Sequence, residues 1–412
     1  MNPVRRSLLA AFGTGAFATL SALLTGCTLP RVWNPCHADL PLALRDHPLV
    51  GAAWEGIDPQ RVWDCHTHLA GIGDSGSGIT LAPEMTSIFH PLSFTQRLFY
   101  LNAGCVHDAP GQVDQSYVER MLNLLEGLPP GVKLMLLAFD RAHNEAGQPL
   151  PDQSAFYVPN DYACGLTRRH PPSLAWVATI HPYRRDAIQA LEQAKADGAR
   201  AVKWLPPAMG IDPAADRCQP FYRAMARLDL PLLTHGGEEK AVHGVGQPEF
   251  GNPLRLRRAL DAGVRTIIAH CASLGEDHDS DHGNRPIASF ALFSRMMADP
   301  AHRDLLFGDI SAITLRNRDP AVVRTILERD DWHSRLLNGS DYPLPGILPM
   351  ISLGHFVRAG LLDVTTVPVL HQIQEYNPLL FDFVLKRQLA AQGRRLPSSV
   401  FATRDFFMRN PG

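Results

Sequence analysis

Val62-Trp63-Asp64-Cys65-His66-Thr67-His68 is an apolar run that closes on two histidines one residue apart. The run has strand character, and side chains two residues apart on a strand point to the same face. His66 and His68 can therefore present two imidazoles to one ion. Each histidine alone is equally compatible with a surface or half-buried residue that hydrogen-bonds to backbone carbonyls. Whether the pair binds a metal therefore depends on whether the rest of the chain places further metal-binding side chains beside it.

Seven further strand-like runs follow, and helix-like segments separate them. The eight predicted strands span residues 61–65, 132–139, 174–180, 199–205, 231–234, 265–269, 304–310 and 334–338. The predicted helices span 117–126, 161–169, 186–196, 219–226, 253–262, 287–298 and 321–328. Nearly continuous apolar strands that alternate with helices are typical of a parallel sheet covered by helices, and eight such units close a barrel.

The sequence therefore predicts an α/β fold of the (β/α)8 TIM-barrel type. A long insertion, residues 71–112 with a helix at 94–103, follows the first strand, and such insertions often form lids. A helical carboxyl-terminal tail begins at residue 351. A doubly wound open sheet is the alternative, but His-Thr-His replaces the glycine-rich turn that usually follows its first strand.

At the amino terminus, Arg5-Arg6 precede an apolar segment, 8–24, and Leu24-Thr25-Gly26-Cys27 closes it. These residues resemble a bacterial lipoprotein signal. This pattern predicts cleavage before Cys27, lipidation of that cysteine, and an exported protein anchored to the bacterial membrane and facing the periplasm. An uncleaved anchor or an ordinary secretory signal are the alternatives, although the apolar segment is short of the ~20 residues of a spanning helix.

The chain is accordingly divided into four predicted parts. They are a signal peptide (1–26), a tether and lead-in (27–58), the barrel (59–390) and a carboxyl-terminal extension (391–412).

Composition narrows the class of partner. Hydrophobic residues make up 45% of the chain, charged residues 19%, and the net charge is -2. These values describe a globular protein without the basic patch that nucleic acid requires, so a small-molecule partner is expected. The widely spaced cysteines do not form a zinc ribbon; Cys65 and Cys271 are interpreted as small buried residues, and export would permit others to pair.

Polar side chains follow several of the predicted strands. In a TIM barrel, residues at the carboxyl ends of the strands converge on one mouth. The residues placed there are His66, His68, Lys203, His235, His270 and Asp341. Zinc binds imidazole nitrogens and carboxylate oxygens, and a catalytic site leaves one position for water. Taken alone, Asp341 is also typical of a turn or cap, and His270 of a core histidine.

Five short motifs surround these residues. They are Asp64-Cys65-His66-Thr67-His68, Val202-Lys203-Trp204, Thr234-His235-Gly236, Ile268-Ala269-His270-Cys271 and Gly339-Ser340-Asp341-Tyr342-Pro343. As an ordered set over residues 59–385, these motifs resemble the amidohydrolase superfamily. The similarity is to its amidohydrolase-related branch, which includes pyrone dicarboxylate lactonase and aminocarboxymuconate semialdehyde decarboxylase.

The resemblance implies metal ligation by His66, His68, His235 and Asp341, with Asp341 also taking the proton of the attacking water. His270 would act as an acid/base or would bind a second ion. Lys203 would be carboxylated and bridge two ions, or would pair as a cation with a substrate carboxylate. We favour one divalent ion, zinc, because the branch is largely mononuclear; two ions are the alternative.

We therefore predict a metal-dependent hydrolase of an ester, lactone or amide. The alternatives are a nonoxidative decarboxylase of the same superfamily and a binding lipoprotein that has lost catalysis. Weaker candidates for substrate contact are Trp54, Trp204, His181, Glu238 and the acidic loop 276–282, which could form a lid or a solvated charge run.

Overall fold

A computed structural model of the chain describes residues 32–107 and 109–409. The predicted signal peptide and Cys27 lie outside these residues. Within them, no helix has both the length and the apolar character needed to span a bilayer.

Eight parallel strands form the centre of the molecule. They are β1 (Trp63–His68), β3 (Lys133–Leu137), β5 (Leu174–Val177), β6 (Val202–Trp204), β7 (Leu232–His235), β8 (Thr266–Ala269), β11 (Leu306–Asp309) and β12 (Leu336–Leu337). Every pairing between neighbours is parallel, in one sheet of order β1-β3-β5 and another of order β6-β7-β8-β11-β12.

Backbone contacts at both seams join the two sheets into a closed barrel. At one seam Ala178 pairs in parallel with Val202. At the other, Thr67 pairs in parallel with Tyr342, and the amide of His68 donates to the Tyr342 carbonyl over 2.9 Å. The strands therefore close in chain order, which confirms the predicted (β/α)8 fold.

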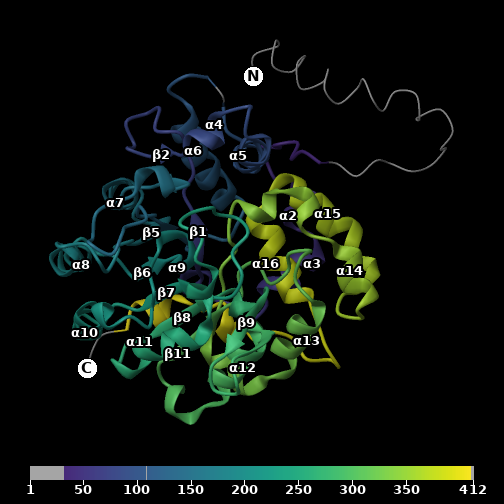
Figure 1. Cartoon of the computed structure of the whole chain (residues 1–412). Coiled ribbons are helices and arrows are strands. Elements are labelled where there is room, and N and C mark those ends of the chain that lie inside the picture. Colours follow the sequence, from purple (N-terminus) through teal and green to yellow (C-terminus); the bar gives the residue numbers. More distant parts are fainter. Residues whose placement is uncertain (1–31, 108, 410–412) are drawn as a thin grey trace.

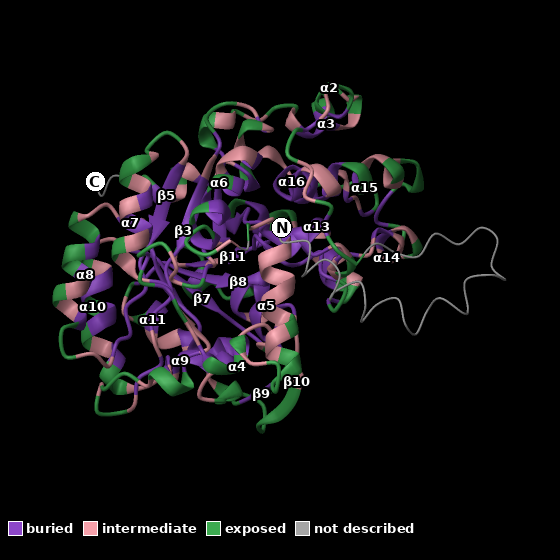
Figure 2. Ribbon diagram, turned by 90° about the horizontal axis from the view of Figure 1, so that it is seen from above, coloured by how far each residue is buried: buried purple, intermediate pink, exposed green. Residues whose placement is uncertain are grey.

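Helices surround the strands, as Figure 1 shows. The helices between and after the strands include α6 (Val113–Glu126), α7 (Asn160–Arg169), α8 (Ala187–Ala196), α10 (Gln219–Arg227), α11 (Arg257–Asp261), α12 (Ser289–Ala298), α13 (Pro320–Glu328) and α16 (Pro378–Gln388). In Figure 2 the labelled barrel strands are buried, whereas α7, α8 and α10 expose their outer faces to solvent. This is the amphipathic pattern expected of helices that cover a sheet.

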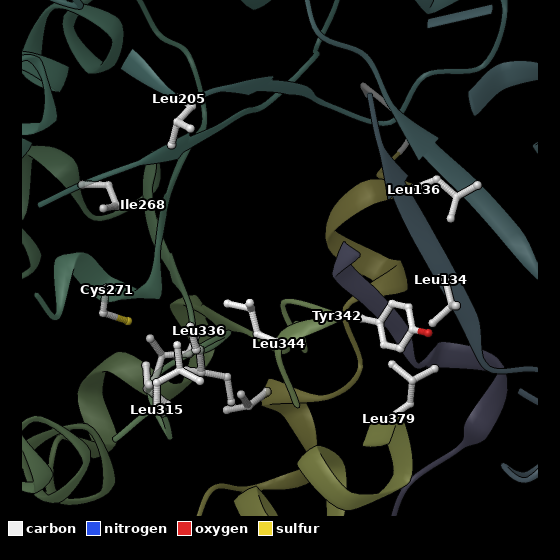
Figure 3. Packing of buried hydrophobic residues seen from close by; sticks show 14 of the residues in the cluster. Leu134, Leu136, Leu205, Ile268, Cys271, Leu315, Leu336, Tyr342, Leu344 and Leu379 are labelled. Carbon is white, nitrogen blue, oxygen red and sulfur yellow. The ribbon is translucent and has the colours of Figure 1, made fainter. Parts of the chain in front are cut away.

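Alternate strand residues build two cores. One set, including Cys65, Met135 and Leu233, fills the barrel interior. The other packs beneath the helices, and Figure 3 shows Leu134 beside Tyr342 in this outer core. Cys65 and Cys271 are free and buried, as their apolar surroundings predict.

The insertion after β1 supplies two helices, α4 (Pro83–Thr86) and α5 (Pro91–Ala103). A short antiparallel pair, β2 (Thr80–Leu81) with β4 (Phe156–Tyr157), ties it to the loop that follows β3. The acidic segment 276–282 is not a loop throughout, because β9 (Glu276–Asp279) pairs with β10 (Arg285–Ala288) in a hairpin. Arg295 of helix α12 donates to both carboxylate oxygens of Asp279 at 2.6 and 2.7 Å, which ties the hairpin to that helix, and residues 276–282 are not among those that line the cavity described below.

The first and last described segments of the chain both pack on the barrel. Within the expected tether, α2 (Leu42–Arg45) and α3 (Pro48–Trp54) form, and a disulfide joins Cys36 to Cys105 of the insertion. After α14 (Leu353–Arg358), α15 (Val367–Tyr376) and α16, the extension returns to the amino ends of the strands. There the Thr403 hydroxyl accepts a hydrogen bond from the Trp63 amide over 3.0 Å, and Phe407 joins the interior core.

Candidate metal centre

The six predicted site residues converge at the carboxyl ends of the strands. They line one cavity of about 590 Å³, together with apolar side chains from α4, α5 and the loops after β3 and β11. Each member is delivered by a strand or its end: His66 and His68 by β1, Lys203 by β6, His235 by β7, His270 directly after β8, and Asp341 after β12. The period-two spacing of β1 thus places both of its histidines on the cavity face.

Asp341 lies at the centre of the histidines. Its Oδ1 is 3.0 Å from His68 Nε2 and 3.5 Å from His66 Nε2, and its Oδ2 is 3.9 Å from His270 Nε2. His66, His270 and Asp341 form a buried group whose ligand atoms all lie within 4.8 Å of one another. One small ion can therefore contact all three.

The backbone at this point is strained. Asp341 has a φ of 61° and His270 a φ of 56°, in the left-handed region that few residues other than glycine adopt. Conformations of this kind cost about 1–3 kcal/mol each and cluster at functional sites. Cys271 and Ala272, which follow His270, also have positive φ, so the turn that begins at His270 is left-handed over three residues.

Asp309 and Ser311, at the end of β11, lie behind the histidines. Asp309 Oδ2 is 2.9 Å from His66 Nδ1, and the Ser311 carbonyl is 3.0 Å from His270 Nδ1. Because a carboxylate and a carbonyl only accept, both Nδ1 atoms carry the proton, and both Nε2 lone pairs face Asp341. This is the outer-shell arrangement that orients metal-binding histidines.

Burial sets the charge of these groups. It lowers the pKa of the His66 and His235 imidazoles and holds that of His270 well below its usual range, so all three favour the neutral form. Burial alone would raise the pKa of Asp341, but His270, His66 and His68 together hold it well below its usual range. The cavity therefore presents neutral nitrogens and an ionised carboxylate.

A comparison of the sequence with family models decides what this barrel is. Residues 63–361 match the amidohydrolase family. The chain belongs to the amidohydrolase family. No curated protein matches the sequence significantly.

Several solved structures are similar to this amidohydrolase. One, from Pseudomonas putida and named as a candidate 2-pyrone-4,6-dicarboxylic acid hydrolase, is 18% identical with a TM-score of 0.43, over 78% of this chain and 97% of that one. The 5-carboxyvanillate decarboxylase from Sphingomonas paucimobilis is 11% identical with a TM-score of 0.42, over 73% and 98% of the two chains. A 2,6-dihydroxybenzoate decarboxylase from Rhizobium is 12% identical with a TM-score of 0.38, over 79% and 98%.

The amidohydrolase site has a donor set that fits a divalent metal. Such ions bind deprotonated ligands, namely neutral imidazole and carboxylate. His66 and His270 offer buried Nε2 lone pairs, and Asp341 offers both carboxylate oxygens. His68 reaches the same oxygen of Asp341 as His66 does.

Lys203 is buried beside this donor set. Its Nζ lies 3.1 Å from His66 Nε2, and burial lowers the pKa of its ammonium. An ammonium that donates to this lone pair occupies the side of His66 on which an ion would bind. The position fits either role predicted for Lys203, a carboxylated ligand or a cation that meets an anionic substrate.

Three weaker candidates do not reach the cavity. Trp54 stacks on Phe383 at 4.0 Å, Trp204 donates to the Ile180 carbonyl over 2.9 Å, and His181 Nε2 contacts the Met209 carbonyl at 3.0 Å. Each is therefore a structural residue, which corrects the prediction of substrate contact.

Glu238 does line the cavity, and so do four charged residues that the sequence did not single out, among them Glu239 and Arg318. Glu239 follows it directly, and Arg318 comes from the loop after β11. The Arg318 side chain is 8% exposed, and its Nε has no hydrogen-bond partner among the described residues. The sequence indicates Glu239 and Arg318 only as charged residues in loops that follow a strand.

Proposed function

We propose that this amidohydrolase is a metal-dependent enzyme that hydrolyses an ester, lactone or amide of a small molecule. The observation that supports it best is the position of the Asp341 carboxylate, within 3.0 to 3.9 Å of three histidine Nε2 atoms. A divalent ion held there would polarise a carbonyl and acidify a water.

The protein's own groups would manage the proton. Asp341 is ionised and faces the cavity, so it can accept the proton of an attacking water. His270, whose Nδ1 proton is held by the Ser311 carbonyl, keeps Nε2 free to receive or return a proton. Apolar side chains line much of the cavity, so a substrate that fills it would displace water and strengthen each of these interactions.

Arg318 supports a substrate that carries an anionic group on an apolar body. Apolar residues such as Phe99, Phe139 and Leu344 line the cavity. A buried guanidinium without a hydrogen-bond partner at Nε is costly unless a ligand satisfies it, and its fork matches a carboxylate. Burial lowers the pKa of Arg318 to about 10, which leaves it charged at neutral pH.

Nonoxidative decarboxylation is the second candidate. Lys203 and Arg318, two buried cations on the cavity wall, could hold the carboxylate that such a reaction removes. The products distinguish the reactions, because decarboxylation releases carbon dioxide whereas hydrolysis yields an acid together with an alcohol or amine.

A panel of lactones, aryl esters, amides and aromatic acids, each with and without a carboxylate, tests the proposal. We expect turnover of a carboxylated lactone or ester, and a fall in kcat rather than a rise in KM for Asp341→Asn. Arg318→Met should lower kcat/KM for the anionic substrate only, whereas Arg316→Met, which changes an exposed arginine nearby, should not. A protein that binds such ligands but turns over none would be the binding lipoprotein instead.

We also propose that the protein is exported and anchored through lipid on Cys27. The Cys36–Cys105 disulfide supports export, because disulfides persist mainly in oxidising compartments.

A further inference from the structure

We propose that Glu239 is a direct metal ligand, which shares a divalent cation with His235 Nδ1. This inference rests on the metal-dependent site proposed above and assigns to it a carboxylate outside the predicted set. Zn²⁺, Mn²⁺ and Co²⁺ are the class of ion that takes one imidazole and one carboxylate.

The loop after β7 fixes the position of Glu239. Gly237 has a φ of +83°, and a Cβ there would lie 2.5 Å from the Leu274 carbonyl oxygen. The Gly237 amide donates to the Gly251 carbonyl over 2.8 Å, and the Glu238 amide to Leu274 over 2.9 Å. This tight turn returns the chain to the cavity within four residues of His235.

The two oxygens of Glu239 have different surroundings. Oε1 accepts hydrogen bonds from the backbone amides of Ala241 and, over 2.9 Å, Val242. Oε2 faces His235 Nδ1 at 3.4 Å. The side chain is only 9% exposed, so this oxygen is aimed into the site rather than toward solvent.

Helix α5 secures the loop from above. The Tyr100 hydroxyl donates to the Ala241 carbonyl over 3.1 Å, and the Gln96 amide donates to the same oxygen. The insertion thereby holds the chain two residues beyond Glu239. The carboxylate is thus preorganised from both sides.

The hydrogen bonds of His235 leave a lone pair directed at Glu239. Its Nε2 lies 3.2 Å from the Glu238 carbonyl, which only accepts, so the proton of the neutral ring is on Nε2. Nδ1 and Glu239 Oε2 are then two acceptors that face each other. Such a pair repels unless a cation or a proton lies between them.

The separation of this pair matches a shared metal ion. Two donors that bind one tetrahedral ion at about 2.0–2.2 Å lie about 3.3–3.5 Å apart, and the observed distance is 3.4 Å. The rival explanation is a proton on Nδ1, which would make Glu239 a hydrogen-bond partner that positions His235.

Cobalt spectroscopy of three proteins distinguishes a ligand from a positioning residue. The apo forms of the wild type, Glu239→Gln and Glu238→Gln are titrated with Co²⁺, and the visible spectrum and the stoichiometry are recorded. Glu239→Gln retains an oxygen for the two backbone amides. Glu238→Gln is the matched control, because that side chain is 42% exposed and pairs with Lys240.

We expect Glu239→Gln to change the Co²⁺ d–d spectrum and to weaken one bound ion at least tenfold, while Glu238→Gln matches the wild type. Glu239→Asp, which keeps a carboxylate, should recover part of the affinity. An unchanged spectrum in Glu239→Gln, with either unchanged or weaker binding, would overturn the proposal. Turnover is not used in this test, so a failed ligand assignment is separable from a failed enzymatic assignment.

Discussion

Replacement of Asp309, whose carboxylate lies behind His66, should prevent His66 from binding a metal although the imidazole itself is still present. Asp309 Oδ2 is 2.9 Å from His66 Nδ1, whereas Oδ1 accepts from the amides of His270 at 3.1 Å and Ser311 at 2.9 Å. In Asp309→Asn the amide oxygen can keep both backbone bonds, which directs the NH2 group at His66. Because NH2 only donates, His66 must then accept at Nδ1 and carry its proton on Nε2.

A protonated Nε2 cannot bind a metal, so we expect the variant to bind the metal more weakly. Loss of such outer-shell partners lowers metal affinity by about 10–100-fold, or roughly 1.4–2.7 kcal/mol. Competition between the apo-protein and a chromophoric chelator for Zn²⁺ measures it. Asp304→Asn, an exposed change before the same strand, is the control. If Asp309→Asn binds Zn²⁺ as tightly as the wild type with its fold intact, the assigned role of Asp309 is wrong.

Three other perturbations test separate parts of the account. Lys203→Ala should leave the number of bound ions unchanged, as measured by elemental analysis, and added bicarbonate should not change the reaction rate of the wild type. Loss of one of two ions in the variant would instead indicate that Lys203 is carboxylated. Cys36→Ser opens a link of 69 residues and should lower the free energy of unfolding by about 4 kcal/mol in the chain-entropy estimate, measured by denaturant titration; an unchanged midpoint would argue against the bond. Cys27→Ala should release the protein from the membrane fraction, and unchanged fractionation and lipid labelling would contradict lipidation.

The barrel and its polar strand ends were predictable because both follow from short-range periodicity. The alternation of apolar strands with helices identified eight units, and the spacing of His66 and His68 placed both on one face. The first strand was nevertheless predicted to end at residue 65, whereas β1 includes both histidines. The apolar pattern did not predict the end of this strand, because its last residues line the site and are therefore polar.

The sequence did not predict residues that are placed by the path of a loop, or residues that contact a site residue and not the cavity itself. Asp309 ends a strand, much as Asp341 follows one, but Asp309 lies in none of the motifs that resemble the family. Its role is visible only in the structure, where its carboxylate lies 2.9 Å from His66 Nδ1. Glu239 depends on a glycine turn whose direction the sequence does not specify. The packing of residues 32–58 likewise depends on distant partners, such as Phe383 beneath Trp54.

Elemental analysis of the purified wild-type protein, beside a His66→Ala/His68→Ala variant, tests whether these histidines hold a metal. We expect at least one divalent transition-metal ion per wild-type chain and a clear loss of metal in the folded variant. A wild-type protein that binds no such ion after dialysis against zinc, manganese or cobalt would contradict the metal centre described above.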